Sequence, residues 1–559
     1  MISTSSYPEG IKIKRLMPFL ALTLLIPSLG ADRTHAISAS SRPTVSERHR
    51  LAHQLLHKAD EAFNKDPNTR FIGDFAELLA RVGDVDNAER IIRQTIPFGR
   101  LDDAGRQILL ADCYALAGDL PRAKQAIELI PGPRPNYDDS KPPTWLSVGR
   151  TFAKRGKKTE AEMAYVEARQ FVVEHPDAWP MIQCQFLADV AESQYALGEK
   201  SEASITFQTA VERGLTADPR EQYVVGDVAA VQAKLGLLDQ ASQTVKRMDE
   251  KDQKVAWSNV IEKLANLDDI NNALRIGKMT GSNEAMDGDA LPIANAYLRD
   301  GKLPEAQQWL NQAEVNWKKI NDLESRITLA CHISDSYATA HDKNAAAQWL
   351  DRALELTETG TVPQKGALRA VEKIPGAVMR QFYLRQIAIA QAKIGLIDTA
   401  KQTFERAKVA AGGEQPGMWQ DSALRVIAGD EAKAGFLDDA LRMLEAAHDS
   451  SPAWQTYIEI ATAKAKQGKI DEAVHIADAH GGIHIGAQYI AKGLLEADDL
   501  KNALRIGLQS NPPEFALRDI AFQYGKNGDV QPILDAVGKC TEPQLQMALL
   551  LGAADGLLN

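Results

Sequence analysis

The sequence is poor in cysteine and in aromatic side chains. Its 559 residues include four cysteines, Cys113, Cys184, Cys331 and Cys540, and aromatic residues make up 6% of the chain. The cysteines are solitary and far apart, with no CxxC pair, so we expect four small buried side chains rather than disulfides. Few aromatics together with recurring alanine suit helices that pack at short range.

Recognisable catalytic motifs are also missing. The chain has no GxSxG, no P-loop and no Cys/His pair in a supporting context. A Ser–His or carboxylate pair assembled from distant parts of the chain would leave no such motif. Within that limit, the sequence predicts a protein that is not an enzyme and that needs no cofactor.

An excess of positive charge is absent as well. The formal net charge is −11, and residues 1–30 contribute +2 of that total, so the rest of the chain carries about −13. A nucleic-acid binder needs cations that neutralise phosphates, so this charge balance argues against nucleic acid as the partner of the whole chain. A local basic stripe stays compatible with it.

Long apolar runs are missing except near the start. Three cations precede an apolar run from Leu16 to Leu29, and small residues follow it, which is the order of a secretory signal peptide. We expect residues 1–30 to be removed, with cleavage possible as late as Ala36, and residues 31–45 to form a linker. The run is short for a membrane span. An exported protein, periplasmic or extracellular, is therefore predicted, and an organelle transit peptide or an uncleaved anchor are the alternatives.

A short pattern recurs along the rest of the chain, in which an alanine follows a glycine by five residues. We call the glycine position the anchor. The pattern keeps both residues nine times, lacks the glycine three times and lacks the alanine once, and its intervals are 30 to 42 residues with one of 54. The thirteen anchors are Gly83, Gly118, Gly156, Gly198, Gly236, Asp268, Gly301, His341, Gly395, Gly435, Gly468, Asp498 and Gly528.

The residues around each anchor predict a pair of helices. Apolar residues before the anchor have helical spacing, and a small residue stands seven positions before it in twelve of the thirteen copies. A glycine ends a helix because it adopts the left-handed conformation without a side-chain clash. The alanine five residues later then lies on the inner face of a second helix. Each copy therefore reads as a helix–turn–helix hairpin, and only a stack of such hairpins buries the apolar faces.

This pattern resembles the tetratricopeptide repeat family over about residues 65–540. A small residue, a tyrosine, the inter-helix glycine and the alanine recur as in that family, and Trp145 and Trp257 match its first aromatic. The copies vary in length and most lack the family's closing proline, so a related helical-hairpin repeat is the alternative. The resemblance implies an all-α solenoid of about thirteen hairpins, wound as a right-handed superhelix.

The ends and the breaks of the array have their own signatures. Residues 46–64 read as an amphipathic helix that caps the array, and residues 541–559 as the first helix of an incomplete hairpin or a second cap. That last segment is unusually apolar, so we expect it to fold back on the array or to be covered by a partner. Pro131–Trp145 and Gly412–Gly417 read as loops, and residues 357–376 in the 54-residue interval read as a loop with an inserted short helix.

Two histidine clusters are possible metal ligands. His49, His53 and His57 are spaced by four residues, and a second group surrounds the sequence GGIHIG. In the first cluster no acid lies at the offset of the zinc-protease helix motif, and the second has no matching carboxylate or cysteine at ligand spacing, so we expect solvated side chains and no metal. The glycine-rich stretch lacks the preceding strand of a phosphate site and reads as a turn between hairpins.

The most informative polar feature is a basic residue two positions before the anchor. Eight of thirteen copies have one, although Lys and Arg are only 64 of 559 residues. We call this set the basic ladder: Arg81, Lys154, Lys234, Arg299, Lys393, Lys433, Lys466 and Lys526.

Two explanations of the basic ladder are open. Each cation stands in the last turn of a first helix, where the helix dipole favours it. In tetratricopeptide arrays the first helices also line the concave groove, so the resemblance implies that the ladder binds carboxylates of an extended acidic peptide. The sequence thus predicts a non-enzymatic scaffold or adaptor that binds a protein, with no nucleic acid. A module that assists envelope or polymer assembly is the alternative, and helical-repeat RNA binding is less favoured.

Overall fold

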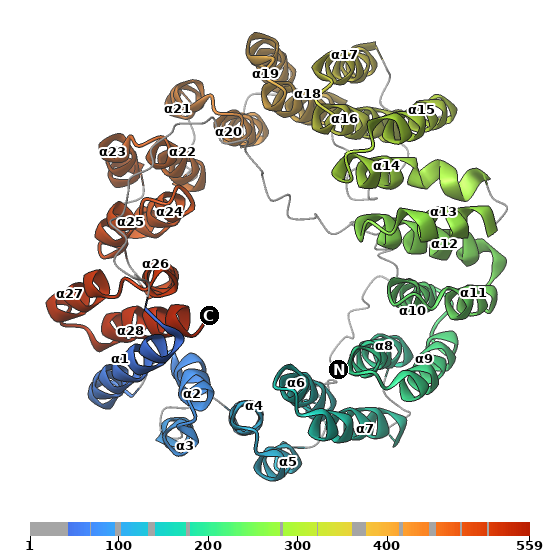
Figure 1. Ribbon diagram of the computed structural model, residues 1–559. Coiled ribbons are helices and arrows are strands. Elements are labelled where there is room, and N and C mark those ends of the chain that lie inside the picture. Colours follow the sequence, from blue (N-terminus) through green and yellow to red (C-terminus); the bar gives the residue numbers. More distant parts are fainter. Residues whose placement is uncertain are drawn as a thin grey trace, which may run out of the picture. The chain divides into compact units, whose positions relative to one another are not determined.

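The computed structural model describes residues 43–559 apart from 68, 95–101, 132–139, 175–178, 280–282, 321, 360–375, 413–417, 447–453, 481–482 and 511–513. The described residues form 28 helices and no strand. In Figure 1 the even-numbered helices follow one side of the array and the odd-numbered helices follow the other. The protein is therefore an all-α solenoid of tetratricopeptide-like helical hairpins.

The even-numbered helices are the first helices of the hairpins. They are α2 (Ile72–Arg81), α4 (Asp103–Ala117), α6 (Lys141–Lys154), α8 (Pro180–Leu197), α10 (Tyr223–Lys234), α12 (Glu250–Asn266), α14 (Asn283–Arg299), α16 (Leu323–Thr339), α18 (Gly376–Lys393), α20 (Met418–Lys433), α22 (Trp454–Lys466), α24 (Ile483–Glu496), α26 (Glu514–Asn527) and α28 (Pro543–Leu558).

The odd-numbered helices are the second helices. They are α3 (Val85–Gln94), α5 (Leu120–Glu128), α7 (Lys158–Glu174), α9 (Lys200–Leu215), α11 (Leu238–Lys246), α13 (Ile270–Met279), α15 (Leu303–Lys319), α17 (Lys343–Thr359), α19 (Ile397–Gly412), α21 (Leu437–Ala446), α23 (Ile470–His480), α25 (Leu500–Gly507) and α27 (Gln531–Lys539), together with α1 (Val45–Lys65).

The thirteen anchors have the backbone conformation that the sequence predicts for them. Every described residue with positive φ is an anchor, and every anchor has positive φ. Three of them are not glycine: Asp268, His341 and Asp498 have φ of 60°, 61° and 59°. The turn geometry is therefore imposed by the hairpin even where the residue disfavours it.

The small residues also take their predicted places. All twelve anchor alanines are fully buried, and Ile533 replaces the thirteenth with no exposed surface. The hydroxyl of Ser334, seven residues before an anchor, donates to the carbonyl of Ala346, the alanine of the same hairpin, at 2.9 Å. This contact shows that the two small positions face each other across the hairpin.

Neighbouring hairpins stack through their first helices. Each first helix packs against the next first helix, and each second helix packs against the first helix that follows it. Buried polar pairs inside some hairpins fix the register of the two helices: Thr206 donates to Gln194 and Thr244 donates to Gln232, both at 2.8 Å. Both pairs are twelve residues apart and span the anchor.

One predicted loop is shorter than expected. Residues 141–145 belong to α6, although the whole stretch Pro131–Trp145 was expected to be a loop. Pro142 and Pro143 stand in the first turn of this helix, where no backbone N–H is needed, so the prolines start the helix instead of preventing it. Residues 483–486 of the sequence GGIHIG likewise belong to α24 and not to a turn.

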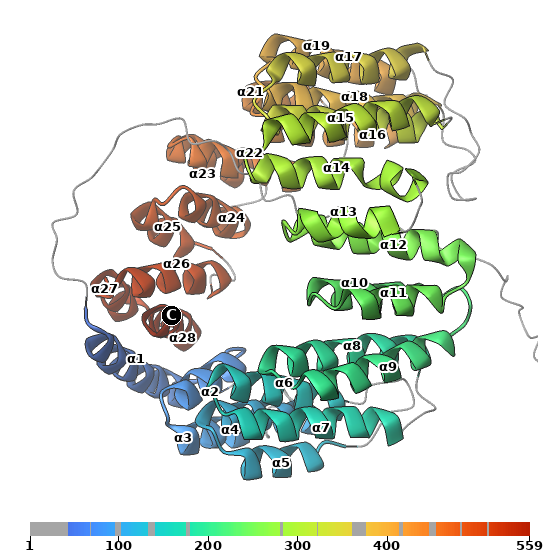
Figure 2. The same ribbon diagram turned by 45° about the vertical axis from the view of Figure 1, so that its right-hand side comes forward.

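The first helix of the chain completes the last hairpin. α1 packs along α28 as extensively as the two helices of an ordinary hairpin pack together, whereas its contact with α2, its neighbour in the sequence, is much smaller and includes Phe63 against Phe75. Both views show α1 beside α28 (Figures 1 and 2). The segment expected to cap the array and the segment expected to be half a hairpin thus form a fourteenth hairpin together.

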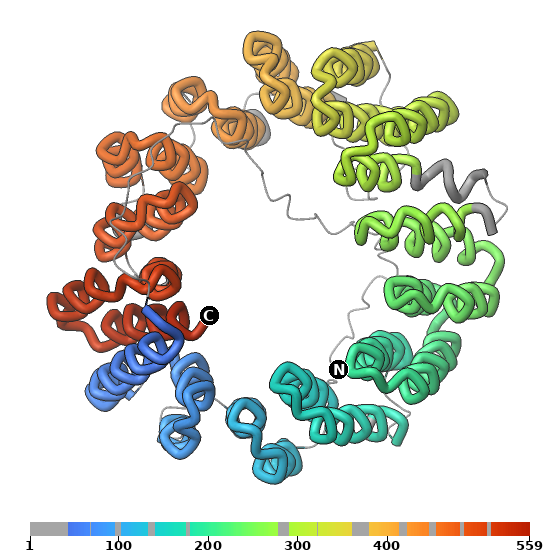
Figure 3. Tube along the Cα trace, in the orientation of Figure 1, coloured from blue at the N-terminus to red at the C-terminus, as the bar shows by residue number. Residues whose placement is uncertain are grey.

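Polar contacts across this terminal hairpin show that its helices run antiparallel. Arg48, near the start of α1, donates to the carbonyl of Lys526, which lies beside the end of α28. Gln544, near the start of α28, donates to Asp66 at the end of α1, at 3.2 Å. The circuit of helix contacts is closed, as the adjacent blue and red ends of the tube in Figure 3 show.

α28 is held against α26 by glycines. A Cβ atom added at Gly525, Gly552 or Gly556 would lie 2.1 Å, 2.3 Å and 2.0 Å from a carbonyl oxygen of the facing helix. Two of these glycines are spaced by four residues on α28, so they lie on one face of the helix. The two helix backbones are in direct contact, and α28 cannot take this position with larger side chains.

Other expectations concern residues outside this description. The signal peptide, its cleavage and most of the linker fall within residues 1–42, which the structure does not describe. Among the described residues, no helix combines the length and the apolar character needed to cross a membrane.

We predict that Gly556→Ala destabilises the terminal hairpin. Its new Cβ would overlap the carbonyl oxygen of Phe522, so α28 must move away from α26 at a cost of about 2 kcal/mol. Gly538→Ala in α27 is the control, because nothing lies within 4 Å of its Cβ position and alanine favours a helix by about 1 kcal/mol. Urea unfolding and hydrogen exchange in α28 measure the difference, and equal stability of the two variants would contradict this packing.

A second prediction concerns the anchors. Asp498→Gly should stabilise the protein by about 1 kcal/mol, since it relieves a left-handed conformation at φ 59°. Gly435→Ala should destabilise it by a similar amount, because its φ is 90° and no neighbour lies within 4 Å. Thermal and urea unfolding measure both changes. A loss of stability in Asp498→Gly would refute the role assigned to the anchor.

Candidate functional site

The exposed side of the first helices is the candidate binding surface. The positions thirteen, nine, six and two residues before the anchor lie within an arc of about 60° on the helix, because each residue advances it by about 100°. We call these four positions, taken over all first helices, the first-helix stripe. The basic ladder occupies its last position.

Apolar side chains recur at the first two positions of the stripe. They are exposed by 38 to 45%: Tyr223 on α10, Val255 on α12, Phe382 on α18, Val426 on α20 and Tyr489 on α24. Sequence reasoning did not single out these residues. Their signal is an apolar residue at a constant distance from the anchor, on the side of the helix opposite the buried small residue.

Carboxylates occupy the middle of the stripe on several helices. Burial raises the pKa of Asp112 to about 6, against the hydrogen bond from the Ser147 hydroxyl, and the neighbouring Glu77 raises it further. Burial also raises the pKa of Glu77, Asp189 and Glu459. These groups lie on one layer of helices, but no described set of them could hold a metal ion.

Most cations of the basic ladder are bonded to a neighbouring first helix. Lys234 on α10 pairs with Glu192 on α8. The Nζ atom of Lys393 on α18 lies 2.9 Å from Oδ1 of Asp335 on α16. In both pairs the carboxylate stands six residues before its own anchor. The last stripe position of one helix therefore meets the third position of the preceding first helix.

Three further cations bind across a repeat boundary by other routes. Lys466 pairs with Glu496, which occupies the ladder position of the next repeat. Arg299 donates to the carboxylate of Asp268, the anchor of the preceding repeat. It also donates to the backbone carbonyl of Ala265, at 2.7 Å. Arg81 pairs with Asp555 of α28 at 2.7 Å. These three pairs join adjacent hairpins.

The remaining three ladder cations differ. Lys433 lies 3.5 Å from Asp430 of its own helix. Lys154 and Lys526 are exposed, and neither side chain has a hydrogen bond or ion pair to a residue in the described ranges. The structure therefore brings most of the ladder into ion pairs between repeats and leaves these two side chains available to a partner.

A buried ion pair links α18 to α20 beneath the stripe. The Nη1 atom of Arg385 lies 2.6 Å from Oδ2 of Asp430, and both side chains are less than a tenth exposed. A buried charge that is paired with an opposite charge destabilises the fold less than the same charge buried without a partner. Arg385 lies within the 54-residue interval between anchors, and Asp430 lies in the next repeat.

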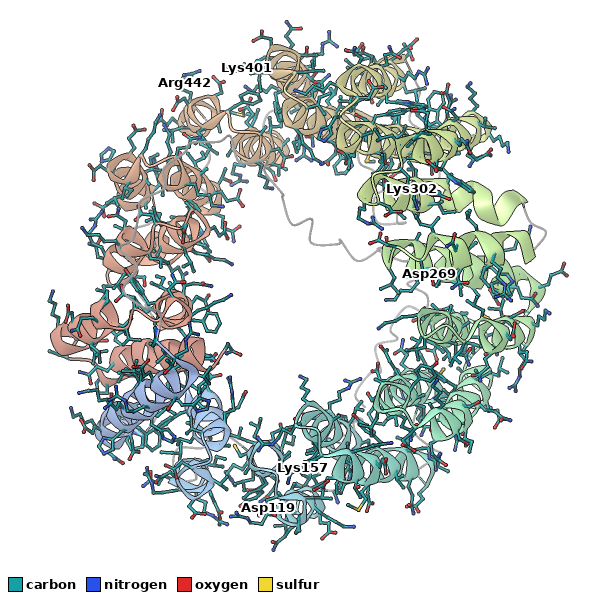
Figure 4. The ribbon with its side chains drawn as sticks, viewed as in Figure 1. Asp119, Lys157, Asp269, Lys302, Lys401 and Arg442 are labelled. Atoms are coloured by element: carbon teal, nitrogen blue, oxygen red, sulfur yellow. The ribbon has the colours of Figure 1, made fainter. Side chains whose placement is uncertain are left out.

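Turns and second helices carry contacts of the same kind. Lys157, labelled beside Asp119 in Figure 4, donates to the carbonyl of Gly118 in the preceding turn at 2.7 Å. Lys401 on α19 and Arg442 on α21 both bind Asp439, which lies on α21 (Figure 4). Polar contacts between repeats are thus a property of the whole array and not of the stripe alone.

The cysteines and histidines occupy separate places. Burial raises the pKa of Cys113, Cys184 and Cys331 to about 12, and all four cysteines are free thiols. His53 and His57 are exposed at the rim of a cavity of about 740 Å³ between α1, α3 and α27. The floor of this cavity is apolar.

Comparison with known proteins yields no family. No family model matches the chain, and no curated protein matches it. The solved structures that are similar to this chain share little sequence identity with it. A Thermococcus onnurineus NA1 protein is 14% identical, with 59% of this chain and 98% of that chain covered and a TM-score of 0.22.

Two other solved structures are similar over most of the chain. The pentatricopeptide repeat protein PPR10 from maize is 12% identical, with 89% and 86% covered and a TM-score of 0.23. A circular tandem repeat protein with a novel repeat topology is 14% identical, with 92% and 96% covered and a TM-score of 0.14. At such scores, the fold assignment rests on the helices and anchors of this chain itself.

The ion pairs between repeats predict a charge-reversal result. Lys466→Glu places a carboxylate against Glu496 and should lower the free energy of unfolding by about 1 kcal/mol. The swapped double variant Lys466→Glu/Glu496→Lys should recover most of that loss. Lys154→Glu is the control, because Lys154 has no described carboxylate partner. Urea unfolding measures all three, and an equal loss in the control would mean that the pairing contributes nothing.

Proposed function

We propose that the protein is a non-enzymatic scaffold that binds another protein along the first-helix stripe. The observation that carries this proposal is the set of exposed apolar side chains at repeated positions on five first helices. Exposed tyrosine and phenylalanine are typical of binding hot spots, because they bury a large area at a low cost in conformational entropy. An extended partner could contact several of them at once.

The basic ladder has a supporting role in this proposal. An acidic partner would have to displace a carboxylate or carbonyl of the array from six of the eight cations. Lys154 and Lys526 can bind a partner's carboxylate without breaking such a contact. We therefore assign most of the binding free energy to apolar contacts and a smaller, orienting part to these two lysines.

We also propose a cellular location for the protein, on the basis of its N-terminal sequence. The charged, apolar and small-residue order of residues 1–30 favours export. The partner would then be a periplasmic or extracellular protein, with an organelle lumen as the alternative site.

The test compares two sets of equally conservative substitutions. In the stripe variant, Tyr223, Phe382 and Tyr489 are each replaced by serine. In the control, serine replaces Ile205, Val315 and Val409, which are 45 to 76% exposed on the second helices α9, α15 and α19. Each protein is used to capture partners from extracts of the native host. The amount captured should fall at least tenfold with the stripe variant and should stay unchanged with the control.

Two results would overturn the proposal. Equal capture by the stripe variant and the unsubstituted protein would remove the role of the apolar positions. Equal loss with the control would show that capture depends on general surface hydrophobicity. The triple variant Lys393→Glu, Lys433→Glu and Lys466→Glu separates the basic ladder from the apolar positions, and we expect it to reduce capture less than the stripe variant does.

A further inference from the structure

We propose that the groove on α28 that α1 fills also accepts α1 from a second copy of this chain. The terminal hairpin would then form between two molecules, and the exchange would be reciprocal or would continue from copy to copy. This interaction surface is separate from the first-helix stripe, so the inference does not depend on the proposed function.

The first argument is that α1 has the character of a second helix. Ala52 and Ala59 are fully buried and seven residues apart, and in five other hairpins the anchor alanine and the alanine seven residues after it are likewise buried. α1 also runs antiparallel to α28, which the contacts of Arg48 and Asp66 establish. By packing, α1 therefore belongs to the last hairpin and not to α2.

The second argument concerns how weakly α1 is held by everything else. Its contact with α2 is small and includes the aromatic pair Phe63 and Phe75, whose ring centroids lie 5.9 Å apart. Its outer flank lines the cavity of about 740 Å³ that separates it from α3 and α27. Its ion pair with α3 is a single contact, Asp60 with Arg90. α28 makes the largest contact with α1, and the smaller contacts with α2 and α3 would form again with an α1 from a second copy.

The third argument is that both arrangements contain the same contacts. In every other hairpin, the anchor turn joins the two helices and keeps them together. α1 and α28 are joined only through the rest of the array. Exchange of a chemically identical helix between copies loses none of the contacts with α28, so the balance depends on protein concentration and on strain in the short stretch that connects α1 to α2.

The experiment uses the full chain with a weakened α1. Ala52→Asp places a carboxylate at a position with no exposed surface, so α1 should leave its groove and the melting temperature should fall by a few degrees. A synthetic peptide of residues 44–66 should then bind the variant with one-to-one stoichiometry and recover at least half of the decrease in melting temperature. His53→Asp, at the adjacent exposed position, should need no rescue.

The peptide itself provides the matched control. A peptide with the Ala52→Asp substitution should not rescue the variant, whereas a peptide with His53→Asp should. Circular dichroism establishes beforehand that the variant keeps its helices. If it does not, Ala52→Ser replaces it, since serine has nearly the same size and lowers the affinity less.

A second measurement tests exchange between whole molecules. The unsubstituted chain, concentrated, warmed just below its melting temperature and cooled, should contain a dimer by light scattering after gel filtration. The His53→Asp chain should form this dimer, and the Ala52→Asp chain should not. Absence of peptide rescue in a folded variant would overturn the proposal, as would a dimer that forms equally well with Ala52→Asp.

Discussion

Every hairpin of this protein depends on how closely its two helices can approach each other. In the thirteen hairpins with an anchor, the approach combines a small side chain on each helix with a chain reversal in the left-handed conformation between them, and the terminal hairpin has no such turn. At Ser334 and Ala346 the two small positions are so close that the serine hydroxyl donates a hydrogen bond to the backbone carbonyl of the opposite helix. The terminal hairpin shows that two helices with such surfaces pack together without a turn between them.

The terminal hairpin consists of two helices that no turn connects. α28 packs as a first helix, and the helix that packs against it as a second helix is α1, from the other end of the described residues. Their association buries a segment whose apolar character was otherwise unexplained. The glycines of α26 and α28 then place the completed hairpin in unusually close contact with its neighbour.

Much of the fold was predictable because the repeat is local. The anchors, the buried alanines and the small residues seven positions before the anchor are confirmed, and each depends on residues close in sequence. Pro131–Trp145 was predicted wrongly in part, because a proline ends one helix and begins another equally well. The partner of α1 could not be predicted, since nothing in a local pattern connects positions 478 residues apart.

The candidate site was harder to predict than the fold for a related reason. The basic ladder is a correct observation about spacing, but the bonding of each cation depends on which carboxylate the adjacent helix brings into reach. Lys234 finds Glu192, while Lys154, at the same position in its repeat, finds no described partner. The apolar members of the stripe were missed because a single exposed tyrosine or valine has no meaning until its position is compared across repeats.

The closed circuit of contacts also sets an order of events during synthesis. α1 leaves the ribosome first, and the helix that completes its hairpin leaves last. At about 5 to 20 residues per second, the roughly 500 intervening residues take about 25 to 100 s to appear. Throughout that interval the apolar face of α1 lacks its main native partner, α28. Neighbouring nascent chains on the same messenger RNA would therefore be the first molecules that could supply α1 with an α28.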